Sequence, residues 1–244
     1  MSNYNTTMTK SSRKRLQKDI IQIIKEPLIE HGIHYAHDEN NFLNGYAVVF
    51  GPSDTIYRHG CYCFKLKFPT NYPFSPPKLT YMTNDGETRF HPNLYRNGKV
   101  CISILNTWKG EQWTSCQSIK SVLLMLVTLF HNKPLLNEPG IKETNSMFIP
   151  YNKIITYKNL EIALLRNIDK EKQKKSMDKC QAFIPIYENY IKKNYKIILN
   201  YVSDLKNNQE GSNEYVRLYN MRANINYSEL YDKIESQIHK LVNL

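Results

Sequence analysis

The stretch Phe90-His91-Pro92-Asn93-Leu94-Tyr95-Arg96-Asn97-Gly98-Lys99-Val100-Cys101 places a side-chain amide and a thiol eight positions apart. Asn97-Gly98 is a dipeptide that favours a tight turn, so the segments on either side of it can lie together. The Asn93 amide and the Cys101 sulfur are therefore expected in one pocket. A thiolate attacks carbonyl carbons well, and an amide N–H can hold the oxyanion that forms when a thioester is made or broken. The pattern predicts acyl transfer through Cys101.

Each of these residues also has an ordinary structural explanation. A free cysteine is frequently a small buried hydrophobic residue, and a loop asparagine commonly hydrogen-bonds its own backbone. The acyl-transfer hypothesis requires a Cys101 sulfur that is accessible and close to the Asn93 amide. The rest of the chain has to supply the context.

Length and cysteine content set the outer limits. The 244 residues fit one large domain, or one domain of about 150 residues with an extension. The five cysteines are odd in number and show no Cys-x-x-Cys spacing for zinc, so no metal site is expected and a reducing cytoplasmic or nuclear compartment fits best. No apolar run approaches the ~20 residues that a membrane span needs. The net charge of +11 suits nucleic acid, an anionic membrane or an acidic protein partner equally.

The hydrophobic pattern predicts an α+β arrangement followed by helices. Apolar residues at helical spacing predict a basic amphipathic helix over residues 10–24 and a buried helix over 117–130. Between these helices, strand-like segments are expected at 45–50, 61–68 and 78–82. A long loop follows at 82–113. After Gly140, helices are expected at about 151–168, 175–205 and 227–242, with a flexible break at 209–213.

Three motifs in this order resemble the ubiquitin-conjugating enzyme family over about residues 10–140. They are Gly51-Pro52-Ser53-Asp54-Thr55-Ile56-Tyr57, then Phe68-Pro69-Thr70-Asn71-Tyr72-Pro73-Phe74-Ser75-Pro76-Pro77-Lys78, and His91-Pro92-Asn93 followed by Cys101. The stretch from Cys101 to Trp108, with Trp113 and Asn137-Glu138-Pro139-Gly140, is most similar to the branch with helical C-terminal extensions, conjugating enzyme Z and the apollon-type proteins.

The resemblance implies a fold and a domain division. An N-terminal helix, an antiparallel four-stranded meander and a central helix would form the conjugating domain at residues 10–151. Residues 1–9 would be a flexible N-terminus, and residues 152–244 a helical extension.

The resemblance also implies a chemistry. An activating enzyme, which consumes the ATP, would hand ubiquitin to Cys101 as a thioester, and a ligase would help pass it to a substrate lysine or to a ligase cysteine. The conjugating enzyme itself would need no cofactor.

Further site residues follow from the same motifs. Asn93 would either donate to the oxyanion or brace the loop, and His91 would be structural. Ser103 stands where relatives often have an acid, and Glu138 lies near where another acid of the acceptor-lysine channel would fall. Ser103 leaves open that ubiquitin passes mainly to a ligase cysteine. His34, His37, His59 and His131 are expected to be ordinary surface or loop residues.

Two surfaces are expected to bind partners. Phe74, Ser115 and Cys116 match the loops that bind the ligase, although Phe74 could instead pack on the neighbouring prolines. The basic residues of the first helix would meet the activating enzyme, unless they are merely solvated; they are Arg13, Lys14, Arg15 and Lys18.

Two alternatives stay open at this level. The modifier could be another ubiquitin-like protein, or the chain could be a non-catalytic scaffold whose basic surface engages nucleic acid or an acidic partner. Cys101 in register with the family motif counts against the scaffold and disfavours nucleic acid as the partner.

Overall fold

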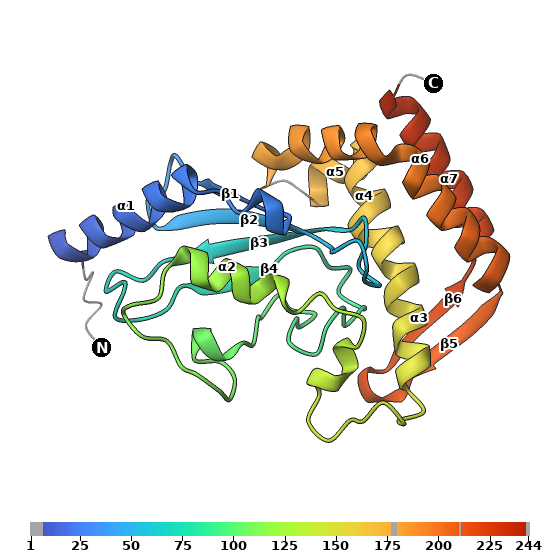
Figure 1. The fold of residues 1–244 in the computed structure, drawn as a ribbon, viewed down its shortest axis with the longest axis horizontal. Helices are drawn as coiled ribbons and strands as arrows, with labels where there is room; N and C mark the ends of the chain where they lie inside the picture. The colour runs from blue at the N-terminus through green and yellow to red at the C-terminus, as the bar shows by residue number, and fades with distance from the viewer. Residues whose placement is uncertain (1–6, 177–179, 210, 243–244) are drawn as a thin grey trace.

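A four-stranded antiparallel sheet forms the centre of the N-terminal part of the chain (Figure 1). The computed structural model describes residues 7–176, 180–209 and 211–242. The strands pair in the order in which they occur, as the predicted meander requires; they are β1 (Ile33–His37), β2 (Asn44–Phe50), β3 (Cys61–Lys67) and β4 (Lys78–Tyr81). Val48 opposite Cys63 sets the central register, and both are fully buried.

Strand β1 has no clear pattern of its own in the sequence. Its five residues, Ile-His-Tyr-Ala-His, mix polar and apolar side chains on both faces, and it lies at the edge of the sheet. A half-buried edge strand gives little alternation. The resemblance implied a fourth strand, whereas the hydrophobic pattern did not locate it.

Two helices cover the sheet as predicted. Helix α1 (Lys10–Lys25) begins at Thr9, whose side chain accepts a hydrogen bond from the Ser12 backbone N–H, and it buries Leu16, Ile20 and Ile23. Helix α2 (Ile119–Val127) begins with a Ser118–Ser121 capping box and packs on β2. It is shorter than the predicted 117–130. Leu129 and Phe130 are buried beyond its end, so the apolar pattern in the sequence continues past the helix itself.

The long loop between β4 and α2 is anchored at several points. The Asn97-Gly98 turn closes as predicted, since Gly98 N–H donates to Tyr95 O and Tyr95 N–H to Lys99 O, both at 2.9 Å. Gly98 has φ +85°, and a Cβ there would lie 2.9 Å from Tyr81 O, so only glycine fits this turn. The Tyr57 hydroxyl donates to Phe90 O at 2.7 Å and fixes the start of the loop.

The C-terminal extension is mainly helical, as predicted. Helix α3 (Phe148–Lys158) continues through the π-helical segment η4 (Asn159–Leu165) into α4 (Arg166–Ile168), which matches the predicted helix at 151–168. Helix α7 (Tyr227–Val242) has the predicted bounds. The helix predicted at 175–205 is wrong in part: α5 (Lys170–Ser176) and α6 (Ile184–Gln209) are separate, and the turn Gln181–Phe183 lies between them. Residues 177–179 lie outside the described residues.

A β-hairpin in the extension was not predicted. Strands β5 (Ser212–Val216) and β6 (Met221–Ile225) are joined by the turn η6 (Arg217–Tyr219) and by Asn220 in the left-handed conformation. They occupy part of the predicted flexible break, of which residue 210 lies outside the described residues. Met221, Ala223 and Ile225 are buried and alternate with exposed residues, so a period-two signal was present in the sequence.

The extension packs closely on the N-terminal part of the chain through the η4 segment. Buried Asn159 accepts a hydrogen bond from the Tyr62 hydroxyl at 2.6 Å and donates to Arg58 O at 2.9 Å. A Cβ at Gly60 would lie 2.0 Å from Asn159 Oδ1, so glycine permits this close approach. The predicted domain boundary after Tyr151 stays a prediction, because α3 runs across this position without a break.

Most of the predicted flexible N-terminal segment, residues 1–6 of 1–9, lies outside the described residues. Within the part of the chain that the structure describes, every helix is too short or too polar to cross a membrane.

Candidate active site

Cys101 and Asn93 are joined across the Asn97-Gly98 turn through the backbone of Cys101, whereas the expected pairing of the Asn93 amide with the Cys101 sulfur stays a prediction. The Cys101 backbone N–H donates to Asn93 O at 2.9 Å, and Asn93 Nδ2 donates to Cys101 O at 2.5 Å. Asn93 is 3% exposed, so these hydrogen bonds are shielded from water. In this arrangement the amide braces the loop that carries the thiol.

The expectation of an accessible sulfur is wrong for this conformation. Cys101 is only 2% exposed. The segment directly after it turns back on itself: Ile102 N–H donates to Thr107 Oγ1 at 3.0 Å, and the Thr107 hydroxyl lies 3.2 Å from Val100 O. A reagent or a second molecule would reach Cys101 only after a local movement of this loop or of the thiol side chain.

A chain of side-chain hydrogen bonds continues from Asn93 through Asn137 to His131. Asn137 Nδ2 donates to Asn93 Oδ1 at 3.4 Å, and His131 Nε2 lies 3.2 Å from Asn137 Oδ1. The Lys133 backbone N–H lies 3.2 Å from His131 Nδ1. Because a backbone N–H can only donate, Nδ1 accepts and Nε2 carries the proton. His131 and Asn137 therefore orient Asn93. His131 lies in a loop, as expected, and its hydrogen bond to Asn137 is a contact that the sequence did not indicate.

His91 has the geometry of a structural residue. It is fully buried, and its Nδ1 accepts the backbone N–H of Asn93 at 3.0 Å. Burial, together with the nearby His131 and Arg89, holds the pKa of His91 well below its usual value. The ring is neutral near pH 7, and its accepting nitrogen is already occupied, so it is a poor general base.

Ser103 and Glu138 belong to different segments of the chain. Ser103 begins the turn η2 (Ser103–Leu105) two residues after Cys101, and it is half-buried. Glu138 follows Asn137 directly, is half-buried, and accepts a hydrogen bond from the Tyr219 hydroxyl at 2.5 Å. The sequence reading did not anticipate Tyr219, because it stands 81 residues away in the extension.

The predicted activating-enzyme surface on α1 divides into two kinds of residue. Arg13, Lys14 and Lys18 are exposed. Arg15 instead donates to Ser115 O and Gln117 O, both at 2.6 Å, and forms an ion pair with buried Asp19 at 3.0 Å. Arg15 thus connects the first helix to the loop before α2.

The predicted ligase-binding residues lie on two loops that are tied together. Phe74 is 74% exposed, so it does not pack away on the neighbouring prolines. Ser115 and Cys116 are also exposed. The indole N–H of buried Trp113 donates to Pro73 O at 2.6 Å and holds the two loops side by side.

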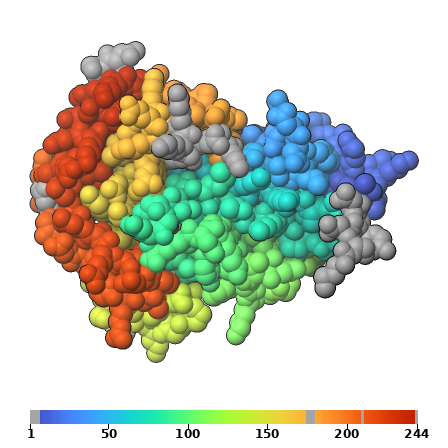
Figure 2. Space-filling view, turned by 180° about the vertical axis from the view of Figure 1, so that it is seen from behind, coloured from blue at the N-terminus to red at the C-terminus, as the bar shows by residue number. Residues whose placement is uncertain are grey.

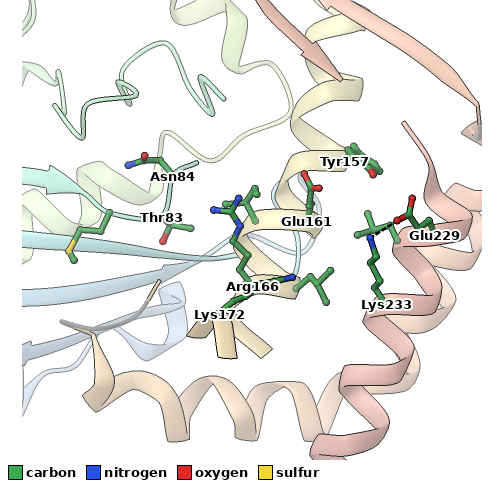
Figure 3. A pocket seen from close by; sticks show the side chains of 12 residues that line it. Thr83, Asn84, Tyr157, Glu161, Arg166, Lys172, Glu229 and Lys233 are labelled. Carbon is green, nitrogen blue, oxygen red and sulfur yellow. Dashed lines mark hydrogen bonds and ion pairs between the residues drawn. The ribbon is translucent and has the colours of Figure 1, made fainter. Parts of the chain in front are cut away.

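A separate cavity of about 530 Å³ lies between the end of β4, the η4 segment and α7 (Figure 3). Glu161 and Arg166 point toward it, and a Lys233–Glu229 ion pair of 2.5 Å lies on its α7 side. Of the described residues that line it, none belongs to the predicted site.

An α+β fold with a turn-closed loop that joins a thiol to a buried amide defines a candidate cysteine acyltransferase. The model of the family described as "Ubiquitin-conjugating enzyme" matches residues 15–153. The chain belongs to the ubiquitin-conjugating enzyme family.

Individual relatives place the chain in the predicted branch. Ubiquitin-conjugating enzyme E2 Z of Xenopus tropicalis is 37% identical over 158 residues, which are 64% of this chain and 50% of that protein. The dual E2 ubiquitin-conjugating enzyme/E3 ubiquitin-protein ligase BIRC6 of Homo sapiens is 44% identical over 103 residues, 40% of this chain and 2% of that protein. The structure of human ubiquitin-conjugating enzyme E2 G1 is 28% identical with a TM-score of 0.43, over 50% of this chain and 94% of that one. The chain spans about half the length of its E2 Z relatives.

Proposed function

We propose that the chain accepts ubiquitin from an activating enzyme as a thioester on Cys101 and transfers it, with a ligase, to a substrate lysine or to a ligase cysteine. The observation that carries the proposal is the contact between Asn93 and Cys101 in a member of this family. Cys101 Sγ attacks the carbonyl carbon of the incoming thioester, a new carbon–sulfur bond forms, and the thiolate of the activating enzyme leaves. An amine or second thiol then attacks the same carbon and releases Cys101 as the thiolate.

The roles proposed for the other residues follow from their positions. Asn93 braces the Cys101 loop and can turn one amide N–H toward the oxyanion. His91 holds the Asn93 backbone. Glu138 is proposed to orient the acceptor lysine, whose amine must lose its proton before it attacks. Ser103 is proposed to lie on the same side of the thioester.

Partners and compartment complete the proposal. Phe74, Ser115 and Cys116 form the proposed ligase surface, and Arg13, Lys14 and Lys18 form the proposed activating-enzyme surface. No cofactor is proposed for this chain, because the activating enzyme consumes the ATP. All five cysteines are free, which supports a reducing compartment such as the cytoplasm or nucleus.

A charging assay tests the proposal. The protein is incubated with activating enzyme, ATP and ubiquitin, and the products are separated with and without reductant. An adduct that disappears with reductant and is missing from Cys101→Ala supports it. A panel of ubiquitin-like modifiers in the same assay identifies the cargo. An uncharged wild-type protein with every modifier would overturn the proposal and favour a binding scaffold.

A further inference from the structure

The turn of the β5–β6 hairpin lies against the loop that precedes Cys101 and against the segment after α2 that carries Glu138. Figure 2 shows the orange-red hairpin region beside the green surface of the loop that precedes Cys101. Tyr219, at the end of η6, contacts both of these segments. Its hydroxyl donates to Glu138 Oε2 at 2.5 Å, and its backbone carbonyl accepts a hydrogen bond from Arg96 at 2.5 Å.

The hydrogen bond from Tyr219 occupies only one of the two carboxylate oxygens of Glu138. Oε2 accepts the phenol proton, whereas Oε1 has no hydrogen-bond partner among the residues that the structure describes. Burial, together with the neighbouring Glu138, raises the pKa of Tyr219, so the phenol stays protonated and is a permanent donor near pH 7. A carboxylate fixed through one oxygen can present the other to an incoming amine.

The Tyr219 ring is also connected to the segment that carries Asn93. The Arg89 guanidinium carbon lies over two rings, 3.4 Å from the centroid of Tyr95 and 5.3 Å from that of Tyr219. The same guanidinium donates to Pro92 O at 2.6 Å, immediately before Asn93. One side chain of the extension therefore contacts the Glu138 segment directly and the Asn93 segment through Arg89.

We propose that Tyr219 is a positioning residue, through which the C-terminal hairpin completes the acceptor side of the active site by fixing Glu138 for the incoming lysine. The inference rests on the proposed function and deepens it, because it assigns a catalytic purpose to the extension. The hydroxyl orients the carboxylate, and the ring over Arg89 keeps the hairpin in register with the Pro92–Asn93 segment. The thiol chemistry of charging does not use this contact.

The test compares Tyr219→Phe with Tyr215→Phe. Tyr215 lies on the same hairpin, and its exposed hydroxyl lies 3.4 Å from Asn220 Oδ1, away from Glu138, so it is a matched control. Preformed thioester is discharged onto free lysine at several lysine concentrations, and charging and melting temperature are measured separately. For Tyr219→Phe we expect about a fivefold or larger loss of kcat/KM for lysine, mostly through a higher KM, with charging changed by less than about twofold. Tyr215→Phe should discharge as the wild type does.

A second variant shows whether the hydroxyl acts through Glu138. Glu138→Ala should slow discharge, and adding Tyr219→Phe to it should cause no further loss, because the oriented group is already gone. Wild-type discharge kinetics in Tyr219→Phe would overturn the inference. A parallel fall in charging, discharge and melting temperature, or multiplied losses in the double variant, would also overturn it. If the wild-type protein forms no thioester at all, the proposed function fails together with the inference; charging without any effect of Tyr219→Phe removes the inference alone.

Discussion

The side-chain amide of Asn93 donates to the backbone carbonyl of Cys101, with 2.5 Å between Nδ2 and the oxygen. The same amide accepts a hydrogen bond from Asn137 through its own oxygen. Both polar atoms of the Asn93 side chain are thus hydrogen-bonded within the protein. An oxyanion role would require one amide N–H to turn toward the tetrahedral intermediate.

Replacement of Asn93 should therefore affect both stability and rate. Asn93→Ala leaves a buried carbonyl at Cys101 without its donor, so we expect the free energy of unfolding to fall by about 1–3 kcal/mol. Discharge of the thioester should fall by about 10²-fold if the amide also meets the oxyanion. Thermal melting and single-turnover discharge measure the two effects.

Asn137→Ala is the matched control for this prediction. It removes the partner of Asn93 Oδ1 and keeps the Nδ2 donor, so it should lower stability with a smaller loss of rate. Slower discharge of Asn93→Ala with unchanged melting temperature would show that the amide does not brace the loop.

The burial of Cys101 predicts an intermediate rate of thiol labelling. Cys116 is exposed. Among the described residues, Cys61, Cys63 and Cys180 belong to the hydrophobic core. Cys101 is buried but lies outside that core. Local opening of a loop costs less free energy than opening of the core. We expect a thiol reagent to modify Cys116 first, Cys101 next and the core cysteines last, as followed by peptide mass spectrometry. Labelling of Cys101 as slow as that of Cys63 would contradict loop opening.

The two kinds of basic residue on α1 predict different mutant phenotypes. Lys14 is exposed, so Lys14→Ala should raise the KM for the activating enzyme, more strongly at low salt, with an unchanged melting temperature. Arg15→Ala removes two hydrogen bonds to the Ser115–Gln117 loop and leaves buried Asp19 without its cation, so the melting temperature should fall. Equal melting temperatures for the two variants would contradict the structural role of Arg15.

Stability should decrease in mild acid because of His59, which connects the conjugating domain to the extension. Its Nδ1 lies 2.8 Å from the Tyr190 hydroxyl on α6, and burial together with Arg58 lowers its pKa from 6.5 to about 4. Between these two values the unfolded chain binds a proton that the folded chain does not, so stability is present above about pH 6.5 and is lost as the pH falls toward 4.

His59→Asn provides the comparison, since asparagine tolerates the φ of +66° at this position and does not titrate. Urea unfolding from pH 7 to 4.5 should show a smaller loss of stability in the variant than in the wild type. Because buried His91 adds a similar dependence, the variant should retain part of it. Identical pH profiles would show that His59 is not the titrating group.

The sequence predicted what depends on local pattern. Leu16, Ile20 and Ile23 at helical spacing located α1, and the Asn97-Gly98 turn located the pairing of Asn93 with Cys101. In both cases the residues that form the signal are close in the sequence to the element that they predict. The strands with clear turn residues between them were found for the same reason.

The missed features depend on contacts between distant segments. Tyr219 approaches Glu138 only because the hairpin folds back onto the segment after α2, and no spacing rule connects residues 81 positions apart. His131 joins the site through Asn137, which depends on tertiary packing. The burial of Cys101 is likewise a property of the folded loop, which a linear pattern of residue types does not contain.

The most direct test of the central claim is the chemical nature of the bond at residue 101. Intact-mass measurement after incubation with activating enzyme, ATP and ubiquitin should show a reductant-sensitive adduct for the wild type and for Cys116→Ser. Cys101→Ser should give an adduct of the same stoichiometry that resists reductant and is cleaved by hydroxide, as expected of an ester. A reductant-sensitive adduct that persists in Cys101→Ser would show that a different thiol carries the acyl group and would contradict the account.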